Sequence, residues 1–267
     1  MEAGFVPVGP RRTFEGAVEQ IAERIRLGEL SAGERLPSER ELAAALQISR
    51  ATLREAVRVL ADAGVLAVRS GSGGGMFVAS GYVPFELVRS MSELRLDEVA
   101  GVLEARRLIE PRVAQLAAVN AREEDYAHMQ QTIDAQKALI VHGSALEHED
   151  RFLQLDTRFH LRIARASGNS TIVSLMRTLF RRLEIARDLA LHEPPTADWV
   201  IDVHERTLAA IRSSDHARIE EVMDEHLGAM ENAWERATDR LLVRPIPDFL
   251  RPLAQRSVHE PVGGATS

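Results

Sequence analysis

The first sixty residues carry apolar patterns that predict three short helices. Apolar residues recur every three or four positions between Phe14 and Ile25 and predict an amphipathic helix that ends near Gly28. Ser38, with Glu41 three residues later, is typical of a capping box and predicts the start of a second helix. This second helix is expected to be short.

A third helix is predicted directly after a turn at positions 47–49. Ser49 can cap this helix, and its apolar stripe from Leu53 to Leu60 would face inward until Gly64 ends it. Two helices joined by so short a turn form a helix-turn-helix candidate.

Two short strands, at residues 65–69 and 76–79, are predicted on either side of the glycine-rich stretch 70–75. They would form a β-hairpin whose glycines let the backbone approach a phosphate or a groove closely. Three helices followed by such a hairpin have the layout of a winged helix. The alternative is that residues 70–75 are only a flexible linker.

From about residue 94 the pattern is helical almost to residue 243. The predicted helices lie near residues 96–119, 123–141, 145–167, 171–191, 196–213 and 216–241. Six helices with short connections pack as an antiparallel bundle. The expected fold class is therefore mostly α, with an N-terminal winged helix-turn-helix (α+β) followed by an all-α helical bundle. The predicted boundaries are 10–80 for the winged helix-turn-helix, 81–93 for a linker, 94–243 for the bundle and 244–267 for a flexible tail.

The composition excludes several classes of protein. No cysteine occurs among the 267 residues, so disulfide frameworks, thiolate metal sites and cysteine nucleophiles are excluded. Only 12 residues are Phe, Trp or Tyr, which disfavours an extended all-β fold. The sequence shows neither a secretory signal nor an apolar run long enough to span a bilayer, so we expect a cytoplasmic protein with no membrane partner.

The charge is distributed unevenly. The net charge of −7 argues against indiscriminate coating of nucleic acid. Residues 1–80 hold 10 Arg and 10 acidic residues, whereas residues 81–267 hold 23 basic and 30 acidic residues. The two predicted domains therefore differ in character, and the acidic excess belongs to the second.

Arginines form one row on the third predicted helix. Arg50, Arg54 and Arg58 follow one another every fourth residue, about 90° around the helix from its apolar stripe, and so point outward. A helix fits the major groove of B-form DNA, where arginine makes a bidentate contact with guanine. Thr52 lies between the first two arginines and could reach a phosphate or a thymine methyl group. The alternative is the solvated basic face of an ordinary helix.

The same region carries a specific resemblance. The run Leu-Pro-Ser-Glu-Arg-Glu-Leu-Ala at 36–43 and the run Ser-Arg-Ala-Thr-Leu-Arg-Glu-Ala-Val at 49–57 closely resemble the winged helix of GntR-type bacterial transcription regulators. In that family the matching arginines and the wing contact operator DNA. The resemblance implies DNA contacts by Arg40, Arg50 and Arg54 and, at the wing tip, by Ser70 and Gly71.

Four potential metal ligands fall on the inward faces of three predicted bundle helices. Asp156 and His160 lie one helical turn apart, on the side of Phe152. His204 and His226 each lie in line with apolar residues of their own helices. One carboxylate with three imidazoles suits zinc or another divalent transition metal, with positions left for water or a ligand. The alternative is four separate core residues satisfied by nearby polar groups.

The bundle carries a second resemblance, to the C-terminal FCD domain of the FadR subfamily. It rests on residues 103–111, on the run 156–169 and on the two later histidines. Many members of that domain hold a metal through the residues that match Asp156, His160, His204 and His226, and bind small carboxylates against the metal and an arginine. Arg106 fits this arginine, because a guanidinium can grip a carboxylate at two points. A salt bridge to Glu110, one turn away, is the competing role for Arg106.

The sequence therefore predicts a ligand-responsive transcription regulator, of the repressor kind, and not an enzyme. It would bind a palindromic double-stranded operator as a homodimer and sense a small carboxylate near a bound divalent transition metal, which would be zinc or else nickel or manganese. The alternative is a metal-dependent hydrolase or lyase on a helical bundle. No His-Glu-x-x-His motif and no identifiable general base support that alternative.

Overall fold

The computed structural model describes residues 13–71, 73–88, 96–141, 148–190 and 197–238. The chain divides into two compact units, Met1–Met91 and Ser92–Ser267. Within the described residues it is mostly helical with one small sheet, which confirms the predicted fold class. The predicted flexible tail at 244–267 lies outside the described residues.

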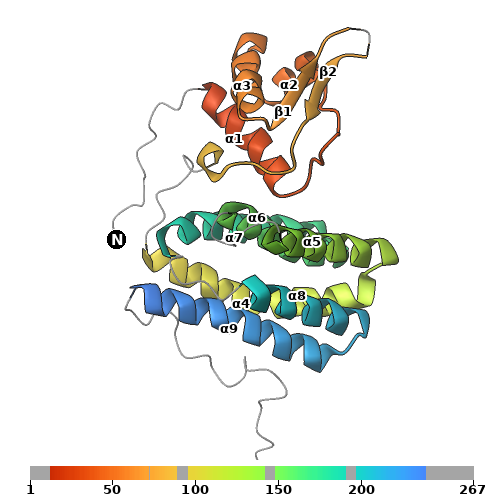
Figure 1. The fold of residues 1–267 in the computed structure, drawn as a ribbon, viewed down its shortest axis with the longest axis vertical. Coiled ribbons are helices and arrows are strands. Elements are labelled where there is room, and N and C mark those ends of the chain that lie inside the picture. Colours follow the sequence, from red (N-terminus) through yellow and green to blue (C-terminus); the bar gives the residue numbers. More distant parts are fainter. Residues whose placement is uncertain (1–12, 72, 89–95, 142–147, 191–196, 239–267) are drawn as a thin grey trace, which may run out of the picture. The chain divides into compact units, whose positions relative to one another are not determined.

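Over residues 13–71 and 73–88, the first unit combines three α-helices with a β-hairpin (Figure 1). Its elements are α1 (Thr13–Arg26), α2 (Glu39–Ala45), α3 (Arg50–Asp62), β1 (Leu66–Arg69), β2 (Gly75–Val78) and the 3-10 helix η1 (Phe85–Leu87). The two strands are antiparallel, with Leu66 opposite Val78 and Arg69 opposite Gly75. The glycine-rich stretch therefore connects paired strands and forms a wing, not a plain linker.

Side-chain caps determine where α2 and α3 begin. The Ser38 hydroxyl accepts a hydrogen bond from the Glu41 amide, and the Glu41 carboxylate accepts one from the Ser38 amide at 3.0 Å, which completes the capping box. The Ser49 hydroxyl caps α3 by accepting from the Thr52 amide at 3.0 Å. The apolar face of α3, centred on the fully buried Leu53, packs against α1. The opposite face of α3 is consequently left to solvent.

Residues 81–88, which we expected to begin a linker, pack on the first unit. Val83 and Val88 belong to its buried core, and Arg26 Nη1 donates a hydrogen bond to the Val83 carbonyl at 2.5 Å. Linker signals in a sequence are local, so they do not reveal that two valines will be buried by a distant helix. The first compact unit accordingly continues past the wing.

In its described part, the second unit has six helices in two layers (Figure 1). They are α4 (Leu96–Asn120), α5 (Glu123–Val141), α6 (Glu149–Ala166), α7 (Ser170–Ala190), α8 (Ala197–Arg212) and α9 (His216–Thr238). Helices α5, α6 and α7 form one layer, and α4, α8 and α9 form the other. Large buried side chains such as Phe159 and Phe180 help to fill the core. Every helix within the described ranges is too short or too polar to cross a lipid bilayer.

Candidate DNA interface and metal centre

The outward face of α3 carries the predicted arginine row. Arg50 and Arg54 keep 60% and 64% of their side-chain surface exposed, and Arg58 is exposed as well. Both Arg50 and Arg54 are held by Glu39, the first residue of α2. Arg50 Nε donates to Glu39 Oε1 at 2.6 Å, and Arg54 Nε donates to Glu39 Oε2 at 2.9 Å.

The two other predicted DNA contacts on these helices are placed differently. Arg40 lies next to Glu39 in the first turn of α2 and is exposed. Thr52 is half-buried, and its hydroxyl oxygen lies 2.8 Å from the Ser49 hydroxyl at the start of α3. Arg40 therefore faces solvent, whereas Thr52 is already engaged by the helix cap.

A groove of 590 Å³ is lined by α3, by residues 35–39 and by the tip end of the two wing strands. Its lining carries the positive charges of Arg35, Arg54 and Arg58 and the negative charge of Glu39, beside apolar residues of α3. Arg35 Nη2 donates to the Gly74 carbonyl at 2.7 Å, and its guanidinium lies over the Phe77 ring, 5.9 Å from the ring centre. Arg35 thus ties the wing to the segment before α2, a role that no sequence motif indicated.

The predicted wing-tip residues Ser70 and Gly71 are both exposed. Gly71 has a φ of +100°, which favours glycine. At Gly74 a Cβ atom would lie 2.5 Å from the Arg69 carbonyl oxygen, so only glycine fits without a shift of the backbone. The glycines therefore shape a tight, narrow tip.

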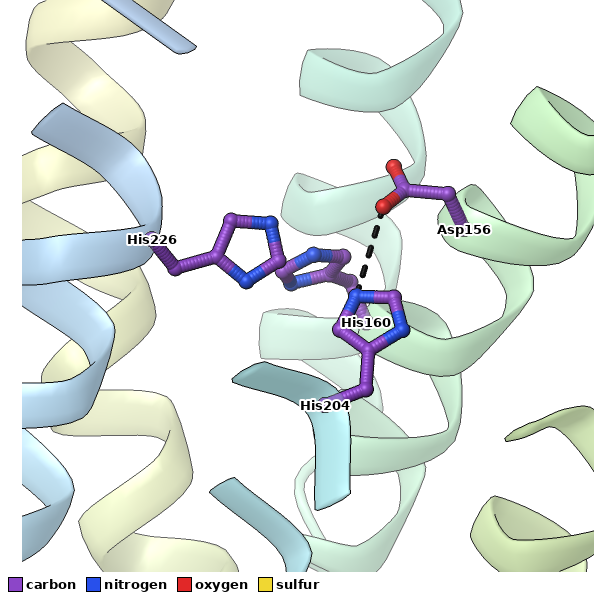
Figure 2. Close-up of side chains that lie close together, drawn as sticks. All are labelled: Asp156, His160, His204 and His226. Carbon is purple, nitrogen blue, oxygen red and sulfur yellow. Dashed lines mark ion pairs between the residues drawn. The ribbon is translucent and has the colours of Figure 1, made fainter. Parts of the chain in front are cut away.

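The second unit gathers the four predicted metal ligands between its two layers (Figure 2). Asp156 and His160 come from α6, His204 from α8 and His226 from α9. Each is buried, and one ligand atom from each lies within 4.8 Å of the others. His204 Nε2 lies 3.3 Å from Asp156 Oδ1. One carboxylate and three imidazoles are thus close enough together that this cluster could hold a metal ion.

The nitrogens that His160 and His226 leave without a hydrogen bond in the described chain, and the neutral ring of His226, suit the binding of a metal ion. His160 Nε2 and His226 Nδ1 are buried and make no hydrogen bond within the described residues. An unsatisfied buried polar atom costs about 1–3 kcal/mol, and a coordinated metal would satisfy it. Burial, with His160 and His204 nearby, holds the pKa of His226 well below its usual 6.5, so its ring is neutral and keeps a lone pair for a metal.

Two further residues lie against the histidines. The buried Gln136, on α5, lies with Oε1 2.9 Å from His204 Nδ1. An acceptor at this position holds the proton on Nδ1 and leaves Nε2 free of its proton, on the side of Asp156. Glu110, on α4, lies with Oε2 2.5 Å from His160 Nδ1, which is an ion-pair distance, although the two groups are not oriented for a hydrogen bond. The sequence indicated neither role, because each joins two helices far apart in the chain.

Arg106, the predicted effector-binding residue, is fully buried on α4. Its Nε donates to Glu110 Oε1, so the competing salt bridge is present. Its Nη1 donates to the sulfur of Met230 at 2.8 Å, and its guanidinium lies over the Phe180 ring at 5.0 Å. Arg106 Nη2 makes no hydrogen bond within the described residues. The salt bridge therefore leaves one buried donor of Arg106 open.

Glu110 links Arg106 to the metal-ligand cluster. Burial acts to raise the pKa of Glu110, but Arg106 and then His160 outweigh it and lower this pKa to about 2. Glu110 is therefore ionised at neutral pH and neutralises the Arg106 charge. A single carboxylate separates the guanidinium from the His160 ring.

A winged helix-turn-helix, joined to a helical bundle that encloses four potential metal ligands, is the architecture of a DNA-binding regulator with an effector domain. Residues 13–78 match the family of bacterial regulatory proteins called gntR, and residues 101–229 match the FCD domain. The regulatory protein named for the L-lactate dehydrogenase operon of Escherichia coli (strain K12) is 31% identical over 237 residues, which cover 85% of this chain and 88% of that relative. The chain belongs to the GntR family of transcription regulators and carries an FCD effector domain.

Other similar proteins are of the same kind. The transcriptional repressor NanR of Salmonella newport (strain SL254) is 26% identical over 235 residues, which cover 85% of this chain and 87% of NanR. A solved GntR of Streptococcus agalactiae has 26% sequence identity and a TM-score of 0.43, and the match covers 81% of this chain and 98% of that one. The family and the two curated relatives from Escherichia coli and Salmonella are transcription regulators and not enzymes, so the hydrolase or lyase alternative is set aside.

Proposed function

We propose that this regulator is a repressor of the FadR subfamily that binds a palindromic operator as a homodimer and responds to a small carboxylate bound beside a divalent metal ion. The observation that carries the proposal is the buried cluster of Asp156, His160, His204 and His226 with the open donor of Arg106 close by. Burying a cation, three imidazoles and one carboxylate lowers the stability of the folded domain, so stability alone does not explain their presence in the core. Their convergence is best explained by ligands that bind there.

In the first unit, α3 would enter the major groove with Arg50 and Arg54 at base edges. These arginines lie in the first turns of α3, which is the part of a recognition helix that reaches base edges. Arg40 would contact the DNA from the start of α2, and Thr52 would contribute a hydroxyl or methyl contact. Ser70 and Gly71 would contact the DNA from the wing tip, where both are exposed.

In the second unit, the proposed ion is zinc, with nickel and manganese as the alternatives. Imidazole and carboxylate ligands suit zinc, and four protein ligands leave room for a further ligand when the coordination expands to five. The ion would satisfy the buried His160 Nε2 and His226 Nδ1. Full-length protein purified without a metal-affinity step should contain about one ion per chain by elemental analysis, and His204→Ala should lose most of it. Equal metal content in both proteins would contradict this site.

The proposed effector is a small carboxylate that one end of Arg106 grips. Arg106 Nη2 offers a buried N–H, and ionised acceptors form the stronger hydrogen bonds with guanidinium groups. Because a similar protein is named for the L-lactate dehydrogenase operon, L-lactate is the first probe to test. Arg106→Lys keeps a positive charge but loses the planar fork, so it should weaken binding of this acid.

The proposed homodimer has support on the second unit. Leu108 on α4 and Leu175 on α7 keep 47% and 45% of their surface exposed, although both are large and apolar. These two helices pack against each other, so their exposed side chains can belong to one continuous contact with a second copy. Leu175→Asp should shift the full-length protein from dimer to monomer in sedimentation velocity. A wild-type protein that sediments as a monomer would refute the homodimer.

The function as a whole is tested by selection of DNA from a random pool. The zinc-loaded wild-type protein should enrich an inverted repeat, and L-lactate should change its affinity for that duplex. Arg106→Lys should still enrich the same repeat but respond less to the acid. Enrichment of no sequence over the starting pool would overturn the proposed reading of DNA, and enrichment that no small carboxylate affects would overturn the proposed effector class.

A further inference from the structure

The carboxylate of Glu39 holds both arginines that face outward from the start of α3. Each of its oxygens accepts one Nε–H, from Arg50 at 2.6 Å and from Arg54 at 2.9 Å. We propose that Glu39 is a specificity-determining residue, which positions Arg50 and Arg54 for base contacts and suppresses binding to DNA of random sequence. This inference rests on the proposed contact of Arg50 and Arg54 with DNA.

The geometry leaves the base-reading ends of both arginines available. A guanidinium has five N–H groups, and a bidentate contact with guanine uses two of them. Glu39 engages only the Nε–H of each arginine, and the four N–H groups on the Nη atoms make no hydrogen bond within the described residues. Because both side chains remain mostly exposed, these outer ends face the solvent that DNA would displace.

The bonds to Glu39 also restrict two flexible side chains before DNA arrives. An arginine that must be ordered on binding loses rotamer freedom, and a preorganised arginine loses less. The gain applies only where the prepared orientation meets a matching base. Positioning by Glu39 therefore favours the operator over other sequences.

The charge of Glu39 acts mainly on binding to random DNA. Hydrogen bonds from Arg54 and then Arg50 hold the pKa of Glu39 below its usual value, so the carboxylate is ionised at neutral pH. One negative charge between two positive charges halves the net positive charge of this cluster. Affinity for random DNA depends on phosphate contacts by positive charges, so Glu39 lowers it. On the operator, correctly placed base contacts offset that loss.

The test compares Glu39→Gln with the matched control Glu41→Gln in the full-length protein. Both variants remove one negative charge from the first turn of α2, but Glu41 bonds to Ser38 and not to an arginine of α3. Glutamine also preserves the capping box at position 41. Affinity is measured by fluorescence anisotropy over a series of salt concentrations. The two duplexes are the one that the wild-type protein selects from a random pool and a scrambled duplex of the same composition.

Glu39→Gln should raise affinity for the scrambled duplex and reduce the ratio of selected to scrambled affinity about tenfold. This loss is within the discrimination that one bidentate arginine–guanine contact provides. The slope of log affinity against log salt on the scrambled duplex should steepen by about 1. Glu41→Gln should change the ratio by less than about twofold, because the Glu41 carboxylate bonds to Ser38 and holds neither Arg50 nor Arg54.

Two results would overturn the inference. One is no change in affinity for either duplex, and the other is an equal rise in affinity for both duplexes, which leaves the ratio at the wild-type value and would mean that Glu39 only masks charge. Arg50→Ala and Arg54→Ala separate this inference from the proposed function. If neither alanine variant lowers the ratio, the proposed DNA contacts fail. If both lower it and Glu39→Gln does not, only the role of Glu39 fails.

Discussion

Gln136 offers a direct test of the proposed metal centre, because it contacts the cluster without belonging to it. Its Oε1 lies 2.9 Å from His204 Nδ1, and its own Nε2 is buried without a hydrogen bond in the described chain. Gln136→Leu keeps the side-chain size while it removes the acceptor that orients His204. Loss of such an outer contact costs about 10–100-fold in metal affinity, which corresponds to about 1.4–2.8 kcal/mol. The substitution leaves His204 Nδ1 without its acceptor, but it also removes the buried Gln136 Nε2, which has no partner in the described chain. Because these two effects offset each other, the free energy of unfolding should change little.

The assay is a zinc titration of the full-length protein in competition with a fluorescent chelator. Gln131→Leu is the control, since Gln131 lies on the same helix and is exposed. Urea unfolding followed by tryptophan fluorescence checks the fold, because both tryptophans, Trp199 and Trp234, lie on helices of the second unit. Zinc affinity of Gln136→Leu within twofold of wild type, with the fold intact, would refute the argument that Gln136 sets the ligand form of His204.

Two further predictions concern stability. Ser49→Ala removes the cap of α3 and should cost about 1 kcal/mol, which lowers the hydrogen-exchange protection of α3 amides about fivefold; unchanged protection would contradict the cap. Burial raises the pKa of Glu231 to about 7 despite the opposing influence of Arg107. Because the folded chain then binds this proton more tightly than the unfolded chain, the free energy of unfolding should fall between about pH 4.5 and pH 7, by about 3 kcal/mol at most. Urea unfolding in a metal chelator measures this fall, which Glu231→Gln should remove; the same pH slope in that variant would show that another group is responsible.

The helices could be predicted from the sequence because their boundaries are set by local residues. The predicted helix at 196–213 is observed as Ala197–Arg212, and the predicted hairpin is observed within one residue at each strand end. Helix periodicity and caps depend on residues a few positions apart, so they can be recognised without knowledge of the fold. The burial of Val83 and Val88 on the first unit could not be predicted in this way, because it depends on where α1 lies.

The inward-facing positions of the four potential metal ligands could also be predicted, because they too depend on local helix periodicity. The spacing of Asp156 and His160 fixes them on one side of α6, and the apolar neighbours of His204 and His226 fix those residues on inward faces. Helix periodicity thus predicts which side chains point into the core. It does not predict the distances between helices, so the convergence within 4.8 Å needed the structure.

Two residues whose roles the sequence did not indicate, Glu39 and Glu110, have one physical feature in common. Glu39 reaches from α2 to the arginines of α3, and Glu110 reaches from α4 to His160 on α6. Each is a carboxylate whose role depends on the angle and distance between two helices, so no spacing within one helix encodes it. Glu110 neutralises the charge of the buried Arg106, which would otherwise destabilise the core. Glu39 offsets part of the positive charge on α3, which would otherwise attract any DNA phosphate. Substitution of such a carboxylate therefore changes two elements at once, and its effect can be interpreted only beside a control that alters the charge alone.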